Sequence, residues 1–147
     1  LESLKTQAQT LGISDKVRFP GAIPWPSMPG FLAAADVIAV PSGQPITYVE
    51  TIHDAQGADG LTYRFRFLAP DIAREGGKIS SDVAQEDMKT LCETFALPHL
   101  TGTGPQVAQI IISLSDRPIP FGEPDPDATQ YFEAFHPEGG ACIWDGF

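Results

Sequence analysis

The strongest constraint on the fold is one amphipathic stretch near the middle of the chain, residues 81–97. Its apolar residues recur at the three- and four-residue spacing that places side chains on one face of a helix. They are Met88, Leu91, Cys92, Phe95 and Ala96. The opposite face is predicted to be polar, with Asp82, Glu86, Asp87, Lys89, Glu93 and Thr94. We predict a helix with Ser81 as its N-cap, ended by Pro98, because the residue before a proline is disfavoured in the α region.

This helix carries one of only two cysteines in the chain. Cys92 lies on the predicted apolar face, and Cys142 lies near the C-terminus. Two interpretations stay open on the residues alone: two separate buried thiols, or a disulfide between helix and tail, since pairing needs geometry and an oxidising compartment. A bridge would close a loop of about 50 residues, for which the chain-entropy estimate is about 4 kcal/mol. Neither cysteine has the CxxC or paired-histidine spacing of a metal site.

Alternating apolar residues predict a β-hairpin before the helix. Ile46–His53 is strand-like, a glycine-bearing turn follows at residues 54–60, and Leu61–Leu68 alternates most clearly. In the second strand the apolar face holds Leu61, Tyr63, Phe65 and Phe67.

Further elements complete the predicted order. We expect a short buried strand at residues 36–40, a strand within 106–115, a second helix over 127–135 and a final strand at 141–144. The inward side chains of the second helix are predicted to be Ala128, Tyr131, Phe132 and Phe135. This order predicts an α+β fold, in two layers, with a mostly antiparallel sheet and two helices on one face.

The N-terminal part differs from the rest of the chain in charge. Residues 1–42 hold three acidic and three basic residues, so the whole net charge of −10 falls on residues 43–147. An acidic surface repels phosphate, so we predict neither nucleic acid nor anionic membrane as a partner. No stretch approaches the roughly 20 apolar residues of a membrane span.

We predict two parts: a helical or irregular leader, residues 1–35, and a small α+β domain, residues 36–147. The leader is expected to open with a helix over residues 1–11, with Leu1, Leu4, Ala8 and Leu11 inward and Gly12 as its C-terminal stop. Because the chain begins with Leu1, we also expect a fragment or a processed product.

The first part carries a family resemblance. Residues 11–42 read LGISDKVRFPGAIPWPSMPGFLAAADVIAVPS. Together with the helix before it, this stretch resembles part of the nucleotide-sugar-binding half of retaining glycosyltransferases of the GT-B type. The resemblance stops after residue 42, and Glu50 lacks the helical context of the donor-gripping acid of that family. It implies a glycosyltransferase-like fragment joined to a different domain.

Residues 36–147 resemble an uncharacterised bacterial family of small exported proteins. The segments that carry this resemblance are VIAVPSGQPITYVE, RFRFLAPDI, DMKTLCETFALPHL and the C-terminal run from IIISLSDRPIPFG to ACIWDGF. Some members carry the label acetolactate synthase, but such a synthase needs a thiamine-diphosphate fold far larger than this chain. The resemblance implies a periplasmic or secreted location and favours the Cys92–Cys142 disulfide.

Three arginines are the candidate anion-binding residues. Arg64 and Arg66 share the non-aromatic face of their strand, and Arg117 opens a proline-rich, acidic loop. Guanidinium groups bind carboxylates and phosphates in a forked geometry. The alternative is that all three are solvated and paired with the acidic surface.

Other reactive residues form no recognisable motif. His53, His99 and His136 lie in separate predicted loops, where locally bonded histidines are commoner than metal ligands. Ser113, Ser115 and Asp116 lack the Gly-x-Ser-x-Gly elbow of a triad. A loose calcium-like cluster is interrupted by prolines and lacks the EF-hand glycine; it holds Glu123, Asp125 and Asp127. Trp25 and Trp144 are predicted as core or partly covered residues.

We therefore predict a small exported domain that is a non-enzymatic binding or structural module for a small ligand or a protein, with no cofactor and no metal. One alternative is a remnant of a glycosyltransferase nucleotide-sugar-binding domain. Another is a small hydrolase or metal protein that uses His53, His99 or His136.

Overall fold

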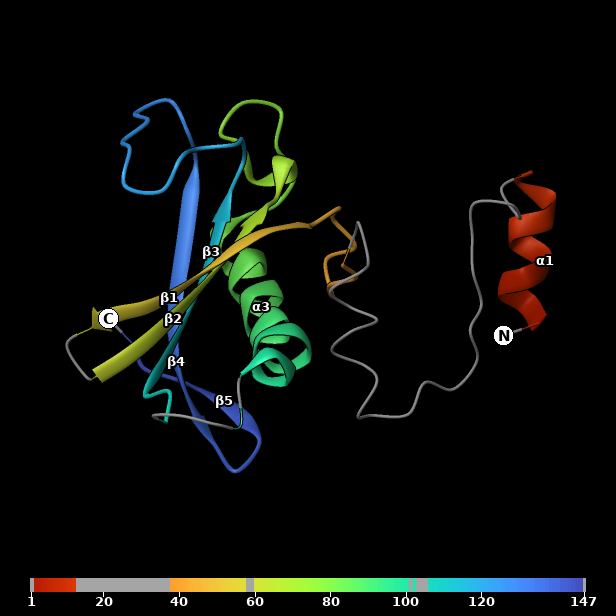
Figure 1. The fold of residues 1–147 in the computed structure, drawn as a ribbon. Coiled ribbons are helices and arrows are strands. Elements are labelled where there is room, and N and C mark those ends of the chain that lie inside the picture. Colours follow the sequence, from red (N-terminus) through yellow and green to blue (C-terminus); the bar gives the residue numbers. More distant parts are fainter. Residues whose placement is uncertain (1, 13–37, 58–59, 101, 103–105, 147) are drawn as a thin grey trace.

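The computed structural model describes residues 2–12, 38–57, 60–100, 102 and 106–146. In these residues two α-helices, α1 (Glu2–Thr10) and α3 (Ser81–Leu91), accompany five strands (Figure 1). The strands are β1 (Thr47–Gly57), β2 (Gly60–Leu68), β3 (Gln109–Ser115), β4 (Gln130–Glu138) and β5 (Ala141–Trp144). Within the described residues, no helix is long and apolar enough to span a membrane.

The five strands form one sheet in the order β1-β2-β3-β4-β5. All neighbouring pairs are antiparallel except β2 and β3, which are parallel. A parallel pair needs a long crossover, and α3 lies in the connection between β2 and β3. The predicted α+β class, with a mostly antiparallel sheet, is confirmed, as are the hairpin and the final strand.

The core lies between α3 and one face of the sheet. Strand residues that face the helix alternate with residues on the other side, as the pleat requires. In β2 and β3, the buried residues that face the helix are Tyr63, Phe65, Phe67, Ile110, Ile112 and Leu114. The predicted apolar helix face is buried throughout, and Phe95 packs its ring against Tyr48, Phe65 and Phe67 with centroids 5.0–6.2 Å apart.

The ends of the helix differ from the prediction. The N-cap is Ser80 rather than Ser81, because the Ser80 hydroxyl accepts from the Val83 amide at 3.5 Å. After Leu91 the chain continues as a π-helical turn, Cys92–Ala96, and a 3-10 turn, Leu97–His99. Leu97 keeps helical angles, φ −54° and ψ −47°, although Pro98 follows, so the proline lies inside the last turn instead of ending the helix before it.

One residue of the predicted polar helix face, Asp87, was wrongly placed. Asp87 is fully buried, not solvated. Its carboxylate accepts hydrogen bonds from the Ser42 amide at 3.0 Å, from the Ser42 hydroxyl at 2.5 Å and from the Gln44 side-chain amide at 2.6 Å. These bonds fasten the segment before β1 to the helix, so Asp87 is a tether between two elements distant in sequence.

The predicted second helix over residues 127–135 is wrong. Most of this stretch belongs to β4, which pairs with β3 through Tyr131 opposite Leu114 and Phe135 opposite Ile110. Phe135 is buried as expected, but Phe132 is 55% exposed because it lies on the other face of the strand. The spacing of aromatic residues fitted both periods, and pairing with a central buried strand decided between them.

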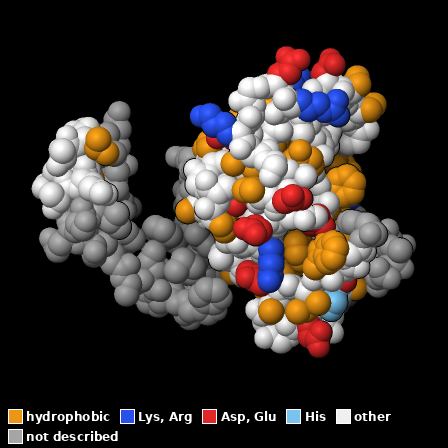
Figure 2. Space-filling view, turned by 180° about the vertical axis from the view of Figure 1, so that it is seen from behind, with side chains coloured by type: hydrophobic (Ala, Val, Ile, Leu, Met, Phe, Trp, Pro, Cys, Tyr) orange, Lys and Arg blue, Asp and Glu red, His pale blue; other side chains and the backbone are white. Residues whose placement is uncertain are grey.

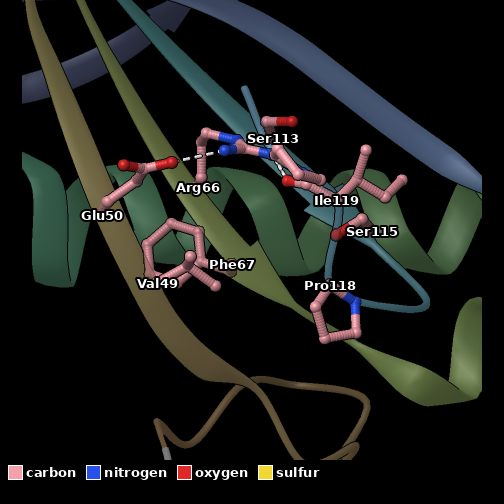
Figure 3. A pocket seen from close by; sticks show the side chains of 9 residues that line it. Val49, Glu50, Arg66, Phe67, Ser113, Ser115, Pro118 and Ile119 are labelled. Atoms are coloured by element: carbon pink, nitrogen blue, oxygen red, sulfur yellow. Dashed lines mark hydrogen bonds and ion pairs between the residues drawn. The ribbon is translucent and has the colours of Figure 1, made fainter. Parts of the chain in front are cut away.

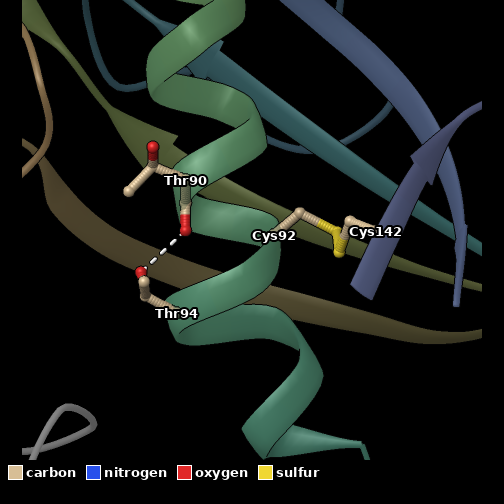
Figure 4. Close-up of a disulfide and its surroundings, with 4 residues drawn as sticks. All are labelled: Thr90, Cys92, Thr94 and Cys142. Atoms are coloured by element: carbon tan, nitrogen blue, oxygen red, sulfur yellow. Dashed lines mark hydrogen bonds between the residues drawn. A yellow bond between two sulfur atoms is a disulfide. The ribbon is translucent and has the colours of Figure 1, made fainter. Parts of the chain in front are cut away.

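The disulfide is present. Cys92, at the start of the π-helical turn, is bonded to Cys142 in β5, with Cα atoms 6.2 Å apart (Figure 4). On the solvent side of the same turn, the Thr94 hydroxyl donates to the Thr90 carbonyl at 2.7 Å. The bridge therefore joins the covering helix to the edge of the sheet, and it confirms the pairing.

The N-terminal predictions are tested only in part. α1 ends before Gly12, whose φ of +67° suits the predicted stop, but Leu11 is 71% exposed instead of inward. Ile38 forms a single bridge with Ile46, so only this part of the predicted strand at 36–40 is seen. Residues 13–37, which carry most of the glycosyltransferase resemblance and Trp25, lie outside the described residues. The boundary at residue 35 stays a prediction.

Candidate functional site

The sheet face opposite α3 carries the candidate site. Strand register brings Glu50, Arg66 and Ser113 side by side across β1, β2 and β3. The proline-rich segment, residues 116–126, follows β3, and its residues Pro118 to Pro124 line hollows on this face. Thus one face of the sheet is packed under a helix, and the other is partly covered by a loop.

Arg66 is the centre of this arrangement. Its guanidinium forms an ion pair with Glu50 and donates a second hydrogen bond to the Ile119 carbonyl at 2.5 Å (Figure 3). The same group lies 5.7 Å from the centroid of the Phe121 ring, within cation–π range. Arg66 therefore joins β1 and β2 to the proline-rich loop and holds that loop over the sheet.

Two hollows meet at Arg66 and form what we call the arginine groove. The first, of about 440 Å³, has Val49, Phe67, Pro118 and Ile119 among its walls. The second, of about 510 Å³, extends past Arg64 toward Phe121 and Gln130. The residues common to both hollows are Arg66, Ser113, Ile119 and Pro120. Volumes of this size are typical of small-molecule sites.

Arg64 differs from its neighbour in having no ion-pair partner among the residues that the structure describes. No carboxylate of the described residues lies within ion-pair distance of Arg64, although Glu123 lines the same hollow. Burial lowers the pKa of Arg64, and the positive charge of Arg66 lowers it further. The groove thus contains a half-buried guanidinium that no carboxylate of the described residues pairs with.

Arg117, the third predicted anion ligand, lies apart from the other two. It contacts the Asp116 carboxylate at 3.1 Å, and this hydrogen bond raises its pKa. Arg117 and Asp116 line a different hollow, with Arg74 and Asp127. The structure therefore brings Arg64 and Arg66 together in one groove and places Arg117 elsewhere, beside its own acid.

The three histidines are dispersed. His53 packs edge-on against Tyr63, and His99 stacks on Phe95 while its Nδ1 lies 2.6 Å from the Phe95 carbonyl oxygen. His136 contacts Asp145 at 2.5 Å, and this bond raises the pKa of His136 above its usual 6.5. Among the described residues, no group of three or more histidine, cysteine and acidic side chains has the arrangement of a metal site.

The serines and acids of the proline-rich region likewise form no catalytic set. Ser113 and Ser115 line the arginine groove, and no histidine of the described residues lines it with them. Asp116 points to Arg117. In the calcium-like cluster, the Asp125 carboxylate accepts from the Asp127 amide at 3.0 Å, which is a local turn contact.

Sequence reasoning missed two buried acidic residues, Asp87 and Glu133. Glu133 belongs to the stretch mispredicted as a helix; it is buried and accepts a hydrogen bond from the indole N–H of Trp144. An acidic residue between aromatic neighbours, as in Tyr131–Phe135, is the only signal that the sequence offered. The remaining acidic side chains on the face shown in Figure 2 are scattered rather than gathered into one patch.

Comparison with known proteins gives a family but no function. Residues 27–147 match the family described as "Family of unknown function (DUF6497)", and the chain belongs to it. No curated protein and no solved structure matches the chain. The match begins inside the predicted leader, and the glycosyltransferase resemblance of residues 1–42 stays a prediction.

Proposed function

We propose that this protein is an exported, non-enzymatic binding module that takes a small anionic ligand in the arginine groove. The observation that carries the proposal is Arg64, a half-buried guanidinium without a carboxylate partner in the described residues. Withdrawing such a charge from water is unfavourable unless an opposite charge compensates it. A ligand carboxylate or phosphate would supply that charge.

The walls of the groove favour a ligand with an apolar part. Val49, Pro118 and Ile119 line the hollow next to Arg66, and Ser113 lines both hollows. Because Arg66 already binds Glu50 and the Ile119 carbonyl, we assign it to positioning the loop, while Arg64 binds the anion. The net charge of −10 disfavours polyanions and favours a small ligand with one or two charges.

Export and the absence of catalysis have their own support. The Cys92–Cys142 bridge is typical of proteins in oxidising compartments, as the family resemblance also implies. The groove offers serines without a histidine of the described residues beside them, which favours binding over hydrolysis. Alkylation of protein recovered from native cells tests export: we expect no free thiol before reduction, and two reactive thiols would contradict it.

Calorimetry with benzoate tests the groove, with benzamide as the uncharged control. We expect benzoate to bind and benzamide to bind much more weakly. Arg64→Gln should weaken benzoate binding about tenfold, as the loss of one charged hydrogen bond implies. Arg74→Gln removes an equal charge from an exposed position outside the groove and should leave binding unchanged. Equal affinities of the two variants, or no heat from benzoate or phenyl phosphate at millimolar concentration, would refute the proposal.

A further inference from the structure

A second site lies on the other side of the sheet, around Glu133 of β4. Glu133 is only 8% exposed. One carboxylate oxygen accepts from the Gln85 side-chain amide and the other from the Trp144 indole N–H, both at 2.6 Å. Both donors are neutral, and no cationic side chain of the described residues is within ion-pair distance of Glu133. A carboxylate charge is therefore withdrawn from water without a counter-charge.

A groove gives access to this carboxylate. Two hollows, of about 220 Å³ and 210 Å³, share Gln85 and Glu133 and run between α3 and the strands β4 and β5. We call them together the Glu133 groove. The first hollow is completed by Glu86, Lys89, Phe135 and Trp144. Figure 2 shows hydrophobic side chains lying beside basic and acidic ones on one face of the molecule.

Trp144 is both fixed and accessible. Its N–H is bonded to Glu133, and Gly146 lies against its six-membered ring, where an added Cβ would be 3.6 Å from two ring atoms. Despite these contacts the residue is 57% exposed, the largest exposed fraction among the aromatic residues of the described part. The fixed indole ring and the buried carboxylate therefore line the same accessible hollow.

We propose that the Glu133 groove binds an organic cation, a primary ammonium or guanidinium group, with Glu133 as its counter-ion and the Trp144 ring as its aromatic wall. Indole is the best cation–π partner among side chains. Each oxygen of Glu133 has accepted one hydrogen bond and retains acceptor capacity for a charged donor. Glu86 adds a second negative charge at the rim.

Lys89 provides an internal test of this assignment. It lines the same hollow, is exposed and has no ion-pair partner in the described residues. Its positive charge opposes an incoming cation. Neutralising Lys89 should therefore tighten binding, whereas it would leave a site for a neutral or anionic ligand unchanged or weakened.

The experiment is titration of the full chain with n-butylammonium and with acetyl-lysine methylamide, with n-butanol as the uncharged control. The readouts are calorimetry and the NMR resonance of the Trp144 indole N–H, which donates to Glu133. We expect both cations to shift this resonance saturably and n-butanol to leave it unchanged. Glu133→Gln should weaken binding about tenfold. Glu75→Gln makes the same charge change at an exposed position outside the groove and should bind as the unmodified chain does.

Lys89→Gln should tighten binding about threefold, because one nearby repulsion is removed. If Glu133→Gln fails to fold, Lys89→Gln alone tests the proposal, and an unchanged or weaker affinity of Lys89→Gln for the cations overturns it. It is also overturned if neither cation shifts the indole resonance, or if Glu133→Gln and Glu75→Gln bind equally. Tighter binding of the lysine derivative assigns the site to a polypeptide side chain, and equal binding assigns it to small amines.

Discussion

The two faces of the sheet are made by the same strands and differ in what covers them. In β2, Tyr63, Phe65 and Phe67 face α3 and are buried, while Arg64 and Arg66 alternate with them on the other side. The helix presents an apolar stripe that buries the sheet residues beneath it, and the Glu133 groove runs along its border with β4 and β5. The proline-rich loop presents a carbonyl, prolines and an exposed Phe121, and it leaves two hollows.

This difference shows that the covering element decides the role of each face. A helix satisfies its own backbone, so its side chains are available for packing. In a proline-rich loop many backbone carbonyls have no backbone hydrogen-bond donor nearby, and the Arg66 guanidinium donates to one of them, the Ile119 carbonyl. Stability should therefore be concentrated under α3, and tolerance to substitution on the open face. Five predictions test that contrast.

The largest loss of stability is expected from Phe95→Ala. Phe95 is 1% exposed and contacts the rings of Tyr48, Phe65, Phe67 and His99. Truncation should lower the free energy of unfolding by about 5 kcal/mol, through lost burial and a cavity. Phe121→Ala, on the open face, should cost about 1 kcal/mol or less. Urea unfolding measures both, and equal losses would remove the contrast between the faces.

Removal of the disulfide should come next. The Cys92→Ala, Cys142→Ala double variant releases a loop that spans a sequence separation of 50. The chain-entropy estimate for such a loop is about 4 kcal/mol. Chemical unfolding with and without reductant checks it: reductant should destabilise the unmodified chain and leave the double variant unaffected. A loss below about 1 kcal/mol would show that packing alone holds the helix on the sheet.

Asp87→Asn should cost about 2 kcal/mol, because the new amide cannot accept all three hydrogen bonds that Ser42 and Gln44 donate. Asp82 is exposed and lies in the first turn of the same helix, so Asp82→Asn is the matched control. It should lower the free energy of unfolding by only about a few tenths of a kcal/mol. Thermal melts compare the two variants. Amide hydrogen exchange at Ser42 should also accelerate in Asp87→Asn alone.

On the open face, Glu50→Gln should cost about 1 kcal/mol or less, since Glu50 is 43% exposed and its ion pair with Arg66 is screened. Its clearer effect should be on the proline-rich loop, where amide exchange should rise. Glu75→Gln, without a partner in the described residues, supplies the baseline. A loss as large as that of Asp87→Asn would mean that the open face is built as firmly as the core.

The smallest effect concerns pH. His136 lies on the open face and its pKa is raised, chiefly by the hydrogen bond with Asp145. A raised folded-state pKa contributes stability that is complete below the unfolded value of 6.5 and is lost as pH rises through the higher folded value. The melting temperature should therefore fall slightly over that interval. Asp145→Asn should flatten this dependence, and an unchanged slope would exclude His136 as its source.

The sequence predicted the elements with one strong period and failed where two periods coexist. Leu61–Leu68 alternates clearly, and residues 81–97 follow a helical stripe, so the strand and the apolar face of the helix were predicted correctly, while the ends of the helix were not. In residues 127–135 the aromatic spacing suits a helix, while Tyr131, Glu133 and Phe135 suit a strand. Only the pairing partner, β3, distinguishes them, and that information lies outside the segment.

The candidate sites show the same limit. Arg64 and Arg66 were found because they share one strand face, which is a local property. The separation of Arg117 from them depends on the path of a loop, which no periodicity reports. Asp87 was predicted on the polar helix face, since its hydrogen-bond donors come from residues more than 40 positions away. Glu133 was not singled out, since its donors come from α3 and β5.

The two edge strands of the sheet bear on whether strands of other chains can add to it. β1 is interrupted by register shifts between Tyr48 and Glu50 and between Ile52 and Ala55, and β5 has only four residues. A straight, long outer strand invites addition of strands from other chains, as in amyloid. The irregular β1 and the short β5 are poor templates for such addition. The aggregation-prone run Ile110–Ile112 lies in β3, in the middle of the sheet, where both of its neighbours are strands of the same chain.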